Sequence, residues 1–161
     1  MLTTFDPDKG PLFKGEFLDV AVLDPAIPGH VPNLVLDPRR DYRISVKWRI
    51  YGSDVPLYLA ALSSEWRVNA YAESMGPGPE VRVATDTINV SAGTNDATVP
   101  FGKVWEHRIT VPAGVLPEDG PNSSGLYKLV VTTFLNSTIG QPGFDIAGFA
   151  EGPIVRVENP V

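Results

Sequence analysis

The sequence contains no cysteine, and this absence excludes disulfide bonds and thiolate-ligated metal sites. A chain without disulfides fits a reducing compartment. Histidine is also scarce: His30 falls in a Pro-Gly turn and His107 in an apolar stretch, so a histidine-ligated zinc site is not expected. Residues 6–10 begin like a calcium-binding loop but lack its later ligands, which predicts a plain turn with two aspartates. We therefore expect neither a metal nor a cofactor.

Long apolar runs are absent as well. No run approaches the ~20 apolar residues that a membrane-spanning helix needs, and the N-terminal residues lack the basic and apolar regions of a signal peptide. The chain has 13 basic and 19 acidic residues, and its formal charge of −6 disfavours binding to nucleic acid or to anionic membranes. These features predict a cytoplasmic protein, with export by another route left open.

The common catalytic motifs are missing too, since no G-x-S-x-G, HExxH, Walker or GxGxxG pattern occurs. Nucleophilic catalysis needs a base beside a serine, whereas we expect His107 to be a packed, hydrogen-bonded core residue. A carboxylate-dependent hydrolase is the remaining enzymatic alternative, because it needs only two carboxyl groups held ~5–9 Å apart. The acids that could supply such a pair are Glu73, Glu80, Glu106, Glu118 and Asp119. Solvated surface acids are the simpler interpretation, so we expect a protein without enzymatic activity.

What the sequence does contain is a stretch of unbroken alternation over residues 41–51. Its apolar members are Tyr42, Ile44, Val46, Trp48 and Ile50, and Arg43, Ser45, Lys47 and Arg49 lie between them. Side chains alternate along a strand with period two, so this pattern predicts an antiparallel strand with one buried face. Any stable fold must cover that face with a second layer.

Further strands are expected wherever β-branched and aromatic residues alternate between turn signals. They are predicted at 16–23, 66–73, 80–90, 104–111, 126–135 and 144–158, with a short edge segment at 33–36 and a strand or single helical turn at 57–62. The first strand is expected to bury Leu18, Val20 and Val22, and the last to bend or bulge at Gly152-Pro153. The 16 prolines and 15 glycines fit many short strands joined by turns.

These segments predict an all-β fold, a single antiparallel β-sandwich of seven to nine strands. At 161 residues the chain is long enough for one domain with a substantial core. Residues 15–161 are assigned to that domain. Residues 1–14 show little periodicity and are expected to form a loose N-terminal arm.

One short motif permits a comparison with a known fold family. Gly125-Leu126-Tyr127 follows a polar loop and opens the strand at 126–135. It resembles the tyrosine corner of immunoglobulin-like sandwiches, in which a tyrosine near the start of strand F hydrogen-bonds to upstream backbone. The resemblance implies that 105–111 is strand E and 144–158 is strand G.

The same resemblance assigns structural roles to the tryptophans. Trp48 or Trp66 would be the core tryptophan, and Trp105 and Tyr127 are expected to be structural as well. The cysteine pair of antibody domains is absent, so the chain is similar to the disulfide-free immunoglobulin-like or fibronectin-like modules of bacteria and phages. The resemblance implies a scaffold that serves assembly, adhesion or carbohydrate contact. C2-like and jelly-roll sandwiches are the alternative folds.

Two groups of side chains are candidates for an interaction surface. The basic group is Arg39, Arg40, Arg43, Lys47 and Arg49, which would suit an anionic partner. Its simpler interpretation is a solvated sheet face paired with acids from adjacent strands. The second group consists of aromatic residues expected to point outwards, namely Tyr51, Tyr58 and Tyr71. Phe134 either belongs to this group or is buried beneath an edge loop.

These features predict a non-enzymatic interaction or assembly module. It would dock to protein partners, or to copies of itself, through a sheet face or an unpaired edge strand. The alternative is a carbohydrate-binding or adhesion module that uses exposed aromatics and the tip loops 52–65, 91–101 and 117–125.

Overall fold

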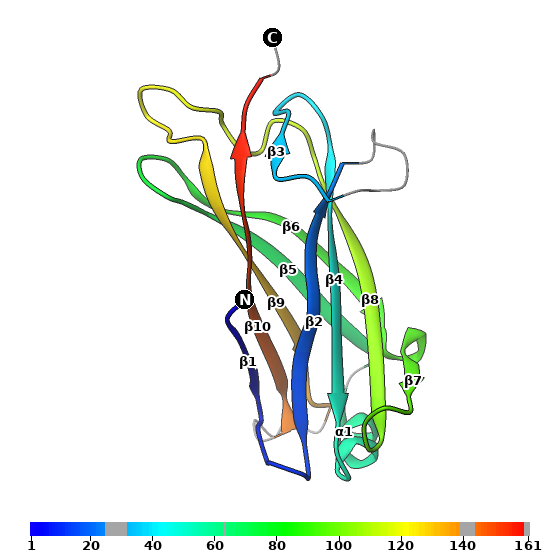
Figure 1. Ribbon diagram of the computed structural model, residues 1–161. Helices are drawn as coiled ribbons and strands as arrows, with labels where there is room; N and C mark the ends of the chain where they lie inside the picture. The colour runs from blue at the N-terminus through cyan, green and yellow to red at the C-terminus, as the bar shows by residue number, and fades with distance from the viewer. Residues whose placement is uncertain (25–31, 63, 139–143, 160–161) are drawn as a thin grey trace.

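The computed structural model describes residues 1–24, 32–62, 64–138 and 144–159. Two sheets pack face to face, which confirms the predicted two-layer β-sandwich (Figure 1). Sheet A has six strands in the order β1-β10-β9-β5-β6, with β3 also paired to β10. Sheet B has four strands in the order β2-β4-β8-β7. Every pairing is antiparallel except that of β3 with β10.

The elements have the following bounds. Sheet A consists of β1 (Thr3–Asp6), β3 (Val35–Leu36), β5 (Glu65–Ser74), β6 (Glu80–Asn89), β9 (Leu126–Leu135) and β10 (Ile146–Val157). Sheet B consists of β2 (Lys14–Leu23), β4 (Tyr42–Tyr51), β7 (Thr94–Asp96) and β8 (Gly102–Val111). The helix α1 spans Val55–Ala61, and the 3-10 turn η1 spans Val90–Ala92.

The described part of the chain therefore has ten strands, more than the seven to nine predicted. The seven long predicted strands and the edge segment at β3 are all present. The additional strands, β1 and β7, have four and three residues, which is too short for alternation to be visible in sequence. Of the two alternatives predicted for residues 57–62, the structure has the helical one, α1. Pro56 lies in the first turn of this helix, where the missing N–H of proline is tolerated.

The alternating strand is β4, and its five apolar side chains are all buried as predicted. Trp48 of β4 lies in register with Trp105 of β8, and Trp66 of β5 meets both from the other sheet. The ring centroids are 5.7 Å apart for Trp48 and Trp66, 5.2 Å for Trp66 and Trp105, and 6.2 Å for Trp48 and Trp105. The Trp105 indole N–H donates to the Val90 carbonyl at 3.0 Å. These three rings form the centre of the core.

The first predicted strand differs from expectation at one position. Val20 and Val22 are buried, but the prediction that Leu18 is buried is wrong. The register of β2 on β4 shifts between Phe17 and Asp19, and this bulge turns Leu18 outwards, where it is 38% exposed. Phe17 takes the inward place instead.

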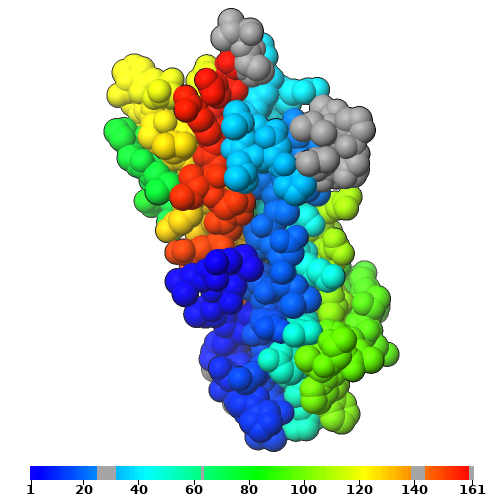
Figure 2. Space-filling model, viewed as in Figure 1, coloured from blue at the N-terminus to red at the C-terminus, as the bar shows by residue number. Residues whose placement is uncertain are grey.

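The N-terminal residues differ from the loose arm that was expected, because Thr3–Asp6 pair with β10 along its free edge (Figure 1). The Phe5 ring packs on Phe17 of β2, with centroids 5.1 Å apart. Gly15 of β2 and Gly148 of β10 make room for it, because a Cβ atom at either position would overlap the ring. Phe5 thus joins sheet A to sheet B along one side of the sandwich, and Figure 2 shows the N-terminal residues lying over this side.

The C-terminal strands form the middle of sheet A. β9 pairs with β5 on one side and β10 on the other, as expected for a strand that is apolar on both faces. The register of β10 shifts between Glu151 and Ile154, which confirms the predicted bulge. The Tyr127 hydroxyl donates to the Pro117 carbonyl at 2.8 Å, so this tyrosine does bond to upstream backbone.

Candidate functional site

The predicted basic residues lie on or just before β4, and most of them face acids. Arg49 donates to Glu16 of β2 and, at 2.8 Å, to Asp96 of β7. Lys47 stands in register between Asp19 of β2 and Glu106 of β8. The outer face of sheet B is therefore a ladder of opposite charges, which favours the simpler interpretation of this group.

The other basic residues do not extend this ladder into one surface. Arg39 folds back on Asp37, with Nε 3.1 Å from the carboxylate, in the turn before β4. Arg40 belongs to the same turn, where its N–H donates to the Asp37 carbonyl at 3.1 Å. Arg43 lies across from Leu23 and Thr110. A concentrated site for an anion is not formed by these five side chains.

Asp96 is the acid of this ladder whose pKa is clearly lowered, mainly by Thr98 and then by Arg49. The Thr98 hydroxyl, the Thr98 N–H and Arg49 all donate to its carboxylate, and they lower the pKa of Asp96 to about 2. The unfolded chain should titrate this group near ~3.9. Asp96 therefore contributes stability above that pH, and the contribution is lost as the pH falls towards about 2.

Asp96→Asn should accordingly lower the free energy of unfolding at neutral pH, and this difference should vanish in acid. Urea unfolding of both proteins at a series of pH values measures it. We expect a constant difference above about pH 5 that shrinks between about pH 4 and 2. A difference that is unchanged across this range would contradict the role assigned to Asp96.

The aromatic candidates divide between the two sheets. Tyr51 lies on the outer face of sheet B, where the Arg49 guanidinium stands 5.3 Å from its ring centroid. Tyr71 and Phe134 are partly exposed on the outer face of sheet A. The prediction that Tyr58 points outwards is wrong: α1 turns it inwards, and it is buried against Phe13, with centroids 4.5 Å apart.

The histidines supply no catalytic constellation within the described residues. His107 donates from Nε2 to an Asp86 carboxylate oxygen at 2.8 Å, and this bond lowers the pKa of Asp86. The predicted hydrogen bond is confirmed, but the predicted core position is wrong. His107 is partly exposed because β8 faces β6 of the other sheet at an open side of the sandwich. His30 lies outside the described residues.

Among the acids considered for hydrolysis, Glu73 and Glu80 are one neighbouring pair, and Glu106 lies on the other sheet. Glu73 and Glu80 are opposite each other on β5 and β6, and Lys128 holds Glu73 at 3.4 Å and Glu151 at 3.3 Å. Those contacts raise the pKa of Lys128, with Glu151 as the largest cause. Glu106 lies on sheet B, and the carboxylate of Glu118 accepts the N–H of Asn159 at 3.0 Å. Asp119 adjoins Gly125 in the loop before β9. Within the described ranges, no cluster of three or more such side chains could hold a metal ion.

The three tip loops do not gather at one end. Segments 52–62 and 91–101 meet at the α1 end, where the Gly52 N–H donates to the Pro100 carbonyl at 2.8 Å. Loop 117–125 lies at the opposite end of the sandwich (Figure 1). At the α1 end Phe101 is 61% exposed and borders a hollow of about 360 Å³. Stable docking buries ~800 Å² on each partner. A tip built from one short helix and one loop offers less surface for this than a sheet face does.

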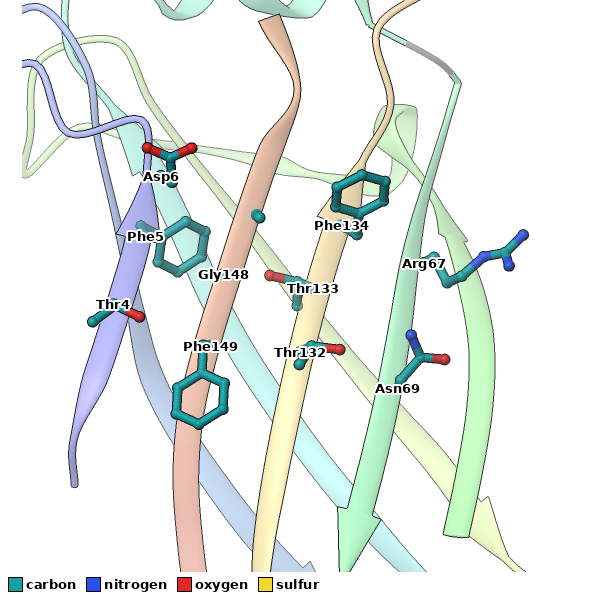
Figure 3. Close-up of a pocket in the computed structure, with 11 residues that line it drawn as sticks. Thr4, Phe5, Asp6, Arg67, Asn69, Thr132, Thr133, Phe134, Gly148 and Phe149 are labelled. Carbon is teal, nitrogen blue, oxygen red and sulfur yellow. The ribbon is translucent and has the colours of Figure 1, made fainter. Parts of the chain in front are cut away.

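The outer face of sheet A carries two adjoining depressions, whereas the largest single one, of about 580 Å³, lies beside Lys47 and Glu106 on the charged outer face of sheet B. One depression of about 440 Å³ lies over β1, β10, β9 and β5 (Figure 3). A second, of about 520 Å³, lies further along β5, β6 and β9. Thr132 and Phe149 border both, so the two depressions form one continuous surface.

The centre of this surface is apolar and its margin is polar. Phe134, Phe149 and Val130 project from β9 and β10, and Val130 is buried even though it points away from the core. Towards the other end of the sheet, Leu126 is 40% exposed and Ile154 is 47% exposed. Figure 3 shows Asp6 on β1 at one margin of the first depression and Arg67 on β5 at the other.

The sequence predicted that Tyr71 points outwards and left Phe134 open between an outward and a buried position, but Phe149, Leu126 and Ile154 were missed. A strand that is apolar on both faces shows no alternation that separates core from surface. The available signal was the outward row of the last strand, Ala147, Phe149 and Glu151, which lies before the bulge and alternates without interruption.

Neither protein-family models nor curated proteins give a match to this sequence. No helix in the described part of the chain is both long and apolar enough to cross a membrane. The geometry of the outer face of sheet A therefore carries the assignment of a site.

Proposed function

We propose that this protein is a non-enzymatic interaction module that docks a protein partner through the outer face of sheet A. The observation that carries the proposal is the unequal distribution of exposed apolar side chains between the two sheets. Among described strand residues, sheet A exposes Val35, Leu126, Phe149 and Ile154, whereas sheet B exposes Leu18 alone. An apolar centre surrounded by polar groups is the usual anatomy of a protein interface.

The sheet edges are less suited to docking than this face. β6 is paired on one side only, with β5, and the register between these two strands shifts between Ala70 and Tyr71 of β5. Asp86 of β6 points towards the other sheet, where it contacts His107. Bulges and inward charges are devices that prevent strand addition at an edge. The edge of β10 is already covered by β1 and β3. These features favour docking through the face of sheet A over strand addition along β6 or β10.

We further propose that the scaffold is an immunoglobulin-like sandwich. The order β2-β4-β8-β7 corresponds to strands A-B-E-D, and β10-β9-β5-β6 to G-F-C with one added strand. Trp66 on β5 then holds the place of the strand C tryptophan, and Tyr127 on β9 supports the tyrosine corner. The chain departs from that pattern in its lack of cysteines and in the strands β1 and β3.

A matched pair of substitutions tests the docking surface. Phe149 is 36% exposed on sheet A and Leu18 is 38% exposed on sheet B, so each can be replaced by serine with a similar change in exposed area. Tagged wild-type protein should co-purify from its host with a stoichiometric partner or an untagged copy. Phe149→Ser should lose that partner at least about tenfold, and Leu18→Ser should retain it. No bound protein, or equal loss with both variants, would refute the proposal.

Carbohydrate binding is the second candidate, and it concerns the same face. Tyr71 and Phe149 border one depression together with the Thr132 hydroxyl and the Arg82 guanidinium. Aromatic rings beside polar groups can stack on and hydrogen-bond to sugars. A glycan array probed with wild type and both serine variants decides: signal lost with Phe149→Ser alone favours a sugar, and no signal above background rejects it.

A further inference from the structure

Two adjacent rows on the outer face of sheet A are each complementary to their own reversed copy. One row runs across four strands as Asp6, Ala147, Phe134 and Arg67, and these residues are successive register partners. The next row is Thr4, Phe149, Thr132 and Asn69. In the middle of each row a phenylalanine stands next to a small or polar residue, so reversing the row brings the two opposite each other. The first row also has an acid at one end and a base at the other.

A twofold axis parallel to the strands, lying between β9 and β10, places each row against its own reversed copy. Asp6 of one chain then faces Arg67 of the other, and Ala147 faces Phe134. In the neighbouring row Phe149 faces Thr132. Packed sheets keep their strand directions within about 30° of each other, so this correspondence holds near the centre of the contact.

The charged ends are available for such a contact. Asp6 and Arg67 are both exposed, and neither forms a salt bridge within the described ranges. Arg67 extends away from Phe134 towards the margin of the face (Figure 3). In the symmetric arrangement the Asp6–Arg67 contact forms twice, once on each side of the apolar centre.

We propose that the partner of the outer face of sheet A is a second copy of this chain, docked face to face about that twofold axis. This inference rests on the proposed function and names its partner. Closed symmetry is the commonest form of self-association, because the same patch serves both chains. The apolar centre supplies affinity, and the two Asp6–Arg67 pairs fix the orientation.

Charge reversal provides a test that only the symmetric arrangement passes. In the symmetric dimer, Arg67→Glu places an acidic side chain opposite Asp6 at both contacts. Asp6→Arg likewise places a basic side chain opposite Arg67 at both contacts. Each variant alone should associate with itself at least about tenfold more weakly than wild type, as like charges in an interface do. An equimolar mixture of the two should regain dimers, since Asp6 of one variant meets Arg67 of the other and the two introduced charges also pair. Sedimentation equilibrium measures association against the monomer mass of 17.4 kDa.

Arg43→Glu is the matched control, because it makes the same charge change on the outer face of sheet B and should leave the dimer intact. Melting temperatures establish that each variant is folded; if a reversal is not, Arg67→Gln and Asp6→Asn replace the pair and should each weaken association less. A wild-type monomer at all concentrations overturns the dimer, as does a dimer that ignores both reversals or a mixture that stays monomeric. In each of these outcomes the proposed function would still hold if a protein partner co-purifies with wild type and with Leu18→Ser but not with Phe149→Ser.

Discussion

Trp66→Ala is expected to lower the free energy of unfolding by about 3–5 kcal/mol, as is usual for removal of a large buried aromatic side chain. Trp66 is fully buried, and its ring lies within 5.7 Å, centroid to centroid, of Trp48 and Trp105. It is also the member of the group that comes from sheet A, so its loss leaves a cavity between the two sheets. Urea unfolding followed by circular dichroism gives the difference.

Leu57→Ala is the control for this experiment, because Leu57 is an exposed residue of α1 and should change stability by less than about 0.5 kcal/mol. The fluorescence of the remaining tryptophans should also change in Trp66→Ala, since both have lost a neighbouring ring. A destabilisation below about 1 kcal/mol would be inconsistent with a cavity of this size and with Trp66 at the centre of the core.

The buried face of a strand could be predicted from sequence because period-two alternation is a property of that strand alone and does not depend on its neighbours. Residues 42–50 show it without interruption, and the row ending at Ile50 is buried. The same reasoning fails where a local irregularity changes the phase. A bulge moves Leu18 outwards in β2, and a helical turn moves Tyr58 inwards, while both residue types fit either location.

The surface was harder to predict because it depends on which strands become neighbours. Arg49 is neutralised by Glu16 and Asp96, which are 33 and 47 residues away in sequence. Sequence identifies the acids as abundant but does not place them beside β4. The outer face of sheet A combines β1, β10, β9 and β5, and its two charged ends, Asp6 and Arg67, come from segments that showed no connection in sequence.

The proposed dimer also assigns a purpose to the N-terminal residues. β1 carries Asp6, so the face would lack its acidic end without this strand. The attachment of β1 therefore links the fold to the interaction surface. That attachment depends on Phe5, which inserts between β10 and β2.

Phe5→Ala should lower the free energy of unfolding by about 2–3 kcal/mol, somewhat less than for a fully buried phenylalanine, because Phe5 is only partly buried. Gly15→Ala should by itself cost about 1–3 kcal/mol, because the added Cβ overlaps the Phe5 ring and forces it to move. In the Phe5→Ala background the overlap is gone. The same Gly15→Ala change should then be neutral or mildly stabilising, since alanine loses less backbone entropy than glycine in a strand.

This change of sign separates a specific ring–glycine contact from a general sensitivity of β2, and the double-mutant cycle should give a coupling of at least about 1 kcal/mol. Thr110→Ala, at an exposed position on the outer face of sheet B, serves as the neutral comparison. Additive effects of Phe5→Ala and Gly15→Ala would mean that Phe5 does not occupy the space above Gly15. The N-terminal strand would then not be anchored across the two sheets, and the acidic end of the docking face would lose its support.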